Sequence, residues 1–173
     1  MNNNTRLKII LVPATLADVG AASMIANRLA GIDYNFFSLD KPIGSLRILE
    51  FTWNSNFDIE LWDICGADSY KTGLPAVAFM DATGMVIVSG DVPRTLLERN
   101  NGFFGSSDFP ILWFVDENTY RYSAQEMALS GLNLMKVHFG GASEEIISVE
   151  FNNWIGKVLT YLNAKQHHSQ HHY

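Results

Sequence analysis

Short apolar runs recur along the chain, separated by polar segments. Each run is bounded by glycine, proline, asparagine, aspartate or serine, residues that favour turns and strand ends. The run 85–88 is entirely apolar, which is typical of a strand buried on both faces. Asn54-Ser55-Asn56 separates two of the runs, and this short spacing predicts an antiparallel hairpin. The predicted strands are residues 8–12, 46–53, 57–63, 84–89, 111–115 and 134–138.

Helical patterns fill the segments between the predicted strands. Asp18 can cap a helix over residues 19–30. Ser143 can cap a long C-terminal helix, because acidic residues follow it in the first turn, where the helix dipole favours negative charge. Shorter helices are predicted at about 93–100 and 124–130. Along the long helix, apolar side chains at three- and four-residue steps predict the buried face: Ile147, Phe151, Trp154, Val158 and Leu162.

The resulting order of elements is β-α-β-β-α-β-α-β-α-β-α, which is also the order of the small GTPases. It predicts a small-GTPase-like, three-layer α/β domain with helices on both faces of the sheet. The sheet is expected to have about six mostly parallel strands, with one antiparallel strand contributed by the hairpin. We expect this domain to span residues 6–164, with disordered ends at 1–5 and 165–173.

Charge and cysteine content narrow the possible partners. The chain has 173 residues, with 12 basic and 18 acidic side chains, and its net charge of −6 argues against a nucleic-acid binder. The single cysteine, Cys65, excludes an intramolecular disulfide and suggests a reducing compartment. The sequence shows neither a signal peptide, a bilayer-spanning run nor a C-terminal cysteine for prenylation. We therefore expect a cytoplasmic protein without a direct membrane anchor, whose histidine-containing end is a polar tail or part of a tag.

The loop after the first predicted strand is where this fold would hold phosphates. That chemistry needs glycines for the backbone cradle, a lysine for the terminal phosphates and a Ser or Thr for magnesium. Placing Ser23 in the magnesium position puts Ala22 in the lysine position, and aligning Gly20 with the last glycine puts Ala21 there. No lysine or arginine lies between residues 9 and 27. The sequence therefore favours a plain strand-to-helix connection over a working phosphate loop.

The second strand of the hairpin ends in Asp63-x-x-Gly66, a pattern that places a carboxylate near magnesium and a glycine N–H near a terminal phosphate. The glutamine that would orient a water after this glycine is replaced by Ala67. A guanine site would carry Asn-Lys-x-Asp after the strand 111–115, but the sequence there is Asp-Glu-Asn-Thr. His138 is expected to be a strand-end residue rather than a catalyst. We therefore expect no catalytic residues and no resident metal.

Several short blocks of the sequence have a specific joint pattern: 25–29, 47–51, 57–66, 75–76, 81–88, 91–93, 136–138 and 143–146. Together these blocks resemble the Rab-like protein five, or intraflagellar transport protein twenty-two, family of small GTPase-like proteins. The similarity extends over most of residues 6–164 and is densest in 46–93.

This resemblance implies a subunit of the anterograde train complex of cilia or flagella, docked on a coiled-coil pair of other train subunits. It also implies localisation to the cilium or flagellum and the basal body. Of the family's nucleotide site, Asp63 and Gly66 match, and Ser23 is carried over as the magnesium-ligand position. The phosphate loop is eroded, and Lys41-Pro42-Ile43-Gly44 provides no switch threonine.

Two functions remain open from the sequence. The first is a pseudo-GTPase that acts as a protein-binding module, is not an enzyme and needs no cofactor. The alternative is an atypical GTP-binding protein with slow or no hydrolysis, binding GTP or GDP with magnesium as a nucleotide-linked switch. Aromatic residues predicted in loops are candidate partner-binding residues, because aromatic side chains are typical interface anchors. They are Tyr34, Phe36, Phe37, Tyr70, Phe103 and Phe104.

Overall fold

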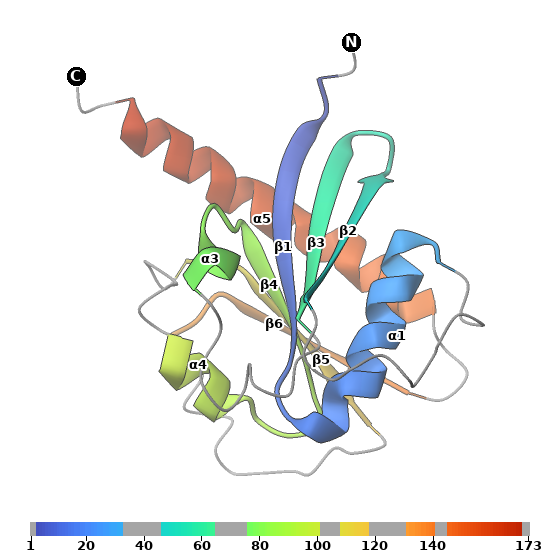
Figure 1. Ribbon diagram of the computed structural model, residues 1–173. Coiled ribbons are helices and arrows are strands. Elements are labelled where there is room, and N and C mark those ends of the chain that lie inside the picture. The colour runs from blue at the N-terminus through green and yellow to red at the C-terminus, as the bar shows by residue number, and fades with distance from the viewer. Residues whose placement is uncertain are drawn as a thin grey trace.

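The computed structural model describes residues 3–32, 46–64, 76–100, 108–117, 131–140 and 145–170 (Figure 1). Several sequence predictions lie outside these residues, among them the helix at 124–130 and the cap Ser143.

A six-stranded sheet with the order β2-β3-β1-β4-β5-β6 forms the middle layer. β2 and β3 pair antiparallel through the predicted hairpin, and the other neighbouring strands pair parallel. The predicted fold class, a mostly parallel sheet with one antiparallel pair, is confirmed. The strands are β1 (Thr5–Pro13), β2 (Leu46–Trp53), β3 (Phe57–Ile64), β4 (Gly84–Ser89), β5 (Ile111–Asp116) and β6 (Leu134–Phe139).

Helices cover both faces of the sheet (Figure 1). α1 (Val19–Ala30) and α5 (Glu145–Ser169) pack on one face, and their apolar side chains share a core with every second residue of β1. α3 (Ala76–Phe79) and α4 (Arg94–Asn100) pack on the other face with the alternate residues of β1. Because successive side chains of a strand point to opposite faces, β1 contributes apolar residues to both cores. Among the described residues, no helix has the length and apolar character needed to cross a membrane.

α5 has the predicted inner face. Ile147, Phe151, Trp154 and Val158 are all buried, and Leu162 is half-buried against the same core. Trp154 approaches the backbone of Gly84 at the start of β4 so closely that a Cβ added there would lie 2.6 Å from its Cη2 atom. Only glycine fits this position with Trp154 in place.

Lysine at position 8 holds the short helix α3 against the sheet. Its Nζ donates to the backbone oxygens of Val77 at 3.1 Å and Met80 at 2.7 Å. The same nitrogen lies 3.9 Å from the centre of the Trp62 ring, a cation–π contact. A single turn of helix is marginal by itself, so these contacts stabilise it.

The first strand and the last helix extend past residues 6 and 164, the bounds given for the domain. Residues 165–169, expected in a disordered tail, form the last turns of α5 and are exposed. Thr5, expected to be disordered, begins β1 opposite Phe57. The helix continues past the core because good helix formers such as Lys165 and Gln166 follow the last packed turn without a glycine or proline to end it.

Candidate functional site

The carboxyl ends of β1, β3, β4 and β5 meet at one edge of the sheet, where open α/β sheets bind their ligands. This edge also holds buried polar side chains, although such groups are normally left in water. Each follows or ends one of the four strands: Asp18, Asp63, Ser89 and Asp116. The edge is therefore the candidate site.

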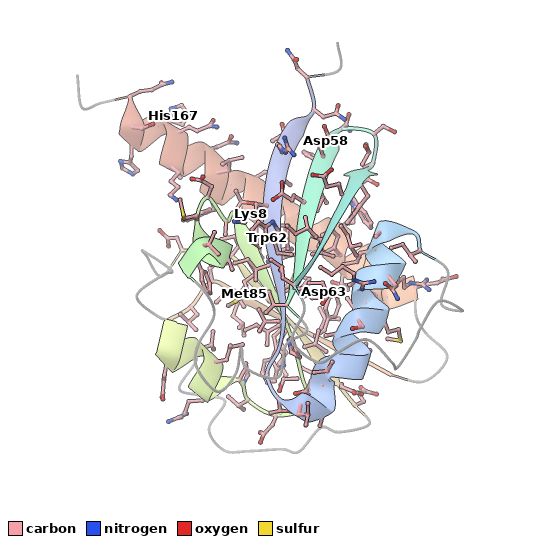
Figure 2. The ribbon with its side chains drawn as sticks, viewed as in Figure 1. Lys8, Asp58, Trp62, Asp63, Met85 and His167 are labelled. Atoms are coloured by element: carbon pink, nitrogen blue, oxygen red, sulfur yellow. The ribbon has the colours of Figure 1, made fainter. Side chains whose placement is uncertain are left out.

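Asp63 is fully buried and forms an ion pair with Arg47 across the hairpin. The antiparallel register places the two residues directly opposite each other on β3 and β2. Oδ2 of Asp63 accepts hydrogen bonds from Nε of Arg47 at 3.1 Å and from Nη2 at 2.8 Å. Asp63 has 0% side-chain exposure and Arg47 has 25%. Figure 2 shows Asp63 at the end of β3 away from the hairpin turn. A guanidinium therefore supplies positive charge directly to this carboxylate.

Asp18 bridges two connections that are far apart in the sequence. One carboxylate oxygen, Oδ2, accepts hydrogen bonds from the Thr15 hydroxyl at 2.7 Å and from the Thr15 N–H at 3.1 Å. The other oxygen, Oδ1, accepts from the N–H of Gly90 at 3.2 Å. Burial raises the pKa of Asp18 above its usual 3.8, and the Asp116 carboxylate raises it further, whereas the hydrogen bonds from Thr15 and Gly90 lower it.

The predicted capping role of Asp18 is only half right. α1 does begin at Val19 with Asp18 at its N-cap position, but the Asp18 side chain makes no capping hydrogen bond. A short 3-10 turn, Leu16–Asp18, precedes the helix and directs the carboxylate back toward Thr15 instead. The connection after β1 is thus held together by hydrogen bonds between two of its own residues, Thr15 and Asp18.

The connection after β4 is also fixed by local hydrogen bonds, which hold the Gly90 N–H in place. The Trp113 Nε1–H donates to the backbone oxygen of Ser89 at 3.2 Å. The Ser89 hydroxyl donates to the backbone oxygen of Asp91 at 2.6 Å and accepts from the Asp91 N–H at 3.1 Å. The small loop between Ser89 and Asp91 is therefore well anchored on β5.

At the end of β5, where a base would be recognised, the side chains are acidic. Asp116 is buried. Glu117 is exposed, and its Oε1 atom lies 3.7 Å from Nδ1 of His138 on β6. His138 is half-buried near the end of its strand, as predicted. Among the described residues, no group of three or more His, Cys, Asp or Glu side chains is placed to hold a metal ion.

The residues predicted for the site have different outcomes. Asp63 lies in it. Ser23 is the fifth residue of α1 and lies half-buried in its second turn, beyond the loop itself. Gly66 lies outside the described residues, and so do all six aromatic residues predicted to bind a partner: Tyr34, Phe36, Phe37, Tyr70, Phe103 and Phe104.

Sequence reasoning missed several participants, among them Arg47, Thr15 and Gly90. Arg47 could have been found, because a hairpin whose turn is 54–56 places it opposite Asp63. Thr15 and Asp18 have the spacing of a capping box, which is a weaker signal. Gly90 contributes only its backbone N–H, which no side-chain pattern reveals.

No family profile matches the chain. Among curated proteins, the chain is similar to a zebrafish (Danio rerio) protein described as "Intraflagellar transport protein 22 homolog". The two are 26% identical, and the similarity covers 93% of this chain and 94% of the zebrafish protein. Because it extends over nearly the whole length of both proteins, it confirms at family level the resemblance of this chain to the intraflagellar transport protein 22 family.

Proposed function

We propose that this protein is a GTPase-like subunit of intraflagellar transport that binds other proteins, holds no guanine nucleotide and does not hydrolyse GTP. The zebrafish relative supports the transport role. The single observation that carries the non-hydrolysing part is the buried ion pair between Asp63 and Arg47. We place the protein in the cilium or flagellum and at the basal body, as a subunit of the anterograde train docked on coiled-coil subunits.

The ion pair opposes the use of Asp63 near magnesium. Magnesium prefers oxygen ligands and keeps several waters, so its carboxylates need access to solvent or to phosphate oxygens. Asp63 has 0% exposure, and its Oδ2 atom accepts two N–H groups of Arg47. Separating such a buried pair leaves an uncompensated charge and costs about 3–5 kcal/mol. A metal would have to displace Arg47 at that cost.

The phosphate end of the site is equally unfavourable. The positions where a phosphate loop would present its lysine hold Ala21 and Ala22, in the first turn of α1, and the Thr15 N–H is already bonded to the Asp18 carboxylate. Asp116 adds a second buried carboxylate close enough to raise the pKa of Asp18. A triphosphate would therefore meet negative charge without a compensating lysine. These residues do not suit a magnesium–nucleotide complex.

Nucleotide content gives the direct test. The purified protein would be denatured, and the released material would be analysed by absorbance and anion-exchange chromatography. We expect far less than one guanine nucleotide per chain, and no GTP turnover above the buffer blank. Stoichiometric GTP or GDP would contradict the proposal and support the alternative, an atypical GTP-binding switch, which the Asp63-x-x-Gly66 pattern at the end of β3 favours.

The transport role has a separate test. A tagged chain would be expressed in ciliated cells, and its sedimentation would be compared with that of known train subunits. We expect it to co-sediment with the anterograde complex and to enter the cilium. A chain that is folded but stays apart from every train subunit would contradict the transport role, whatever its nucleotide content.

A further inference from the structure

We propose that the Asp18 carboxylate is the built-in occupant of the anion position at the carboxyl edge of the sheet, where it ties the β1–α1 and β4–α4 connections together and keeps a free phosphate or pyrophosphate out. The inference rests on the proposed function in that it concerns the same non-hydrolysing site. It assigns a role to a buried charge that no catalytic or partner-binding function uses.

The first support is the set of donors that converge on Asp18. They are the N–H and hydroxyl of Thr15 and the N–H of Gly90, at 2.7 to 3.2 Å from the two carboxylate oxygens. Backbone N–H groups that converge at a strand-to-helix connection form an anion-binding concavity. Here that concavity holds a carboxylate that is 2% exposed. The donors are already satisfied, and water is excluded.

The second support is that the occupant is covalently tethered. Asp18 follows Thr15 by three residues in the same short turn, so its carboxylate is always close to two of its donors. A tethered group competes at an effective concentration in the millimolar range or above, roughly, which a free anion must exceed. Asp18 therefore holds the position against phosphate at ordinary concentrations.

The third support is the charge nearby. Asp116 lies close enough for its carboxylate to raise the pKa of Asp18. An incoming phosphate would add negative charge beside Asp116 even after displacing Asp18, and the segment 9–27 supplies no lysine or arginine to offset it. Asp116 therefore adds to the barrier that Asp18 itself sets against an incoming anion.

Asp18→Asn tests the tie between the two connections. An amide has almost the shape of a carboxylate but a single acceptor oxygen, so Asn cannot accept from both Thr15 and Gly90. We expect the amide hydrogen of Gly90 or of Thr15 to exchange at least about tenfold faster in nuclear magnetic resonance spectra, with the far-ultraviolet circular dichroism unchanged. That factor corresponds to the loss of one hydrogen bond to a charged group.

Asp91→Asn is the matched control. Asp91 is an exposed carboxylate in the same loop, and its Oδ1 accepts from the Val92 N–H rather than contacting the β1–α1 connection. We expect the exchange of Gly90 to be unchanged in this variant. Unchanged exchange at both Thr15 and Gly90 in folded Asp18→Asn would overturn the proposal, and so would equal acceleration by the two substitutions.

A pyrophosphate titration tests the exclusion of anions. We expect the Thr15 and Gly90 amide resonances of the wild-type protein to stay in place over a range of pyrophosphate concentrations in which those of Asp18→Ala shift in a saturable manner. Asp91→Ala should behave as wild type. Equal responses in wild type and Asp18→Ala, or none in folded Asp18→Ala, would overturn the exclusion. Because pyrophosphate carries no base, these outcomes are independent of whether GTP co-purifies with the wild-type chain.

Discussion

The charged pairs near the two ends of β3 differ in their exposure to solvent. Figure 2 shows the two ends, with Asp58 near the hairpin turn and Asp63 at the other end. Near the hairpin turn, Arg6 lies 3.6 Å from Glu50 and 3.4 Å from Glu60, and the Arg6 side chain is 71% exposed. At the other end, Arg47 meets Asp63 at 2.8 Å, and Asp63 is fully buried. Both ends pair an arginine with a carboxylate on neighbouring strands. The two ends therefore differ in how far solvent reaches the charged pair, not in the kinds of residue that are paired.

The difference indicates at which charged residues the stability of the fold depends on the presence of both partners. An exposed pair is weak because water solvates both partners when they separate. A buried pair is not a strong source of stability compared with apolar residues, but losing one partner leaves a charge in a medium that cannot solvate it. The carboxyl edge of the sheet should therefore be sensitive to single charge deletions, and the hairpin end should tolerate them.

Removing the buried arginine should have the largest effect. Arg47→Ala should lower the free energy of unfolding by about 3–5 kcal/mol, because the buried Asp63 carboxylate keeps its charge after the Arg47 guanidinium is removed. Urea unfolding followed by circular dichroism measures this loss. Replacing both residues, Arg47→Met with Asp63→Leu, should restore most of it. A loss below about 1 kcal/mol for Arg47→Ala would remove the distinction between the two ends.

At the start of β4, stability should depend on the size of the side chain rather than on its charge. Gly84→Ala should destabilise the protein by about 1–3 kcal/mol, since the added Cβ would overlap the Trp154 ring. Gly156→Ala on α5 is the matched control, because nothing lies within 4 Å of its added Cβ. That change should stabilise the helix by about 0.5–1 kcal/mol. Thermal unfolding of the two variants would show shifts of opposite sign.

The raised pKa of Asp18 predicts that the free energy of unfolding depends on pH. Its raised pKa means that the folded state holds this proton at pH values where the unfolded state has released it, so stability falls as pH rises from 3.8 through the folded-state pKa. Asp18→Asn lacks this contribution. The unfolding free energy of wild type relative to Asp18→Asn should therefore decline across that window, by at most about 1.4 kcal/mol per pH unit. A rising difference would contradict the direction of the shift.

The exposed arginine should give the smallest effect. Arg6→Ala should change the free energy of unfolding by about 0–1 kcal/mol, since both of its ion pairs are solvated. Raising the salt concentration to about 1 M, where the screening length is about 3 Å, should remove what remains. The effect of Arg47→Ala should persist in the same buffer. If both effects vanished in salt, the buried pair would behave as a surface pair.

Periodicity was sufficient to predict the fold, because each strand and long helix has one dominant apolar pattern. α1 and β2 have the predicted bounds, and Trp154 is buried as the phase of α5 required. The inner face of α1 is less evident in the sequence: Ala22 and Ile25 are buried in the core, whereas the larger Met24 is only partly buried. Small residues weaken the pattern there, and neighbours in space decide which of them are covered.

The candidate site was harder to predict because its contacts join distant elements. Asp63 was recognised from a local pattern, whereas its partner Arg47 depends on the hairpin register. Asp18 was recognised as a helix start, but its carboxylate turns toward Gly90, which lies beyond β4 in the sequence. Local propensity predicts where a helix begins, and tertiary contacts decide what the first side chain binds.

The close approach of Trp154 to Gly84 also constrains how the sequence can change over time. A side chain acquired at position 84 would be tolerated only after the indole at 154 had been replaced by something smaller. The smaller residue would in turn leave a void until position 84 was filled. The two positions therefore form a coupled pair, and descendants of this chain should change both or neither.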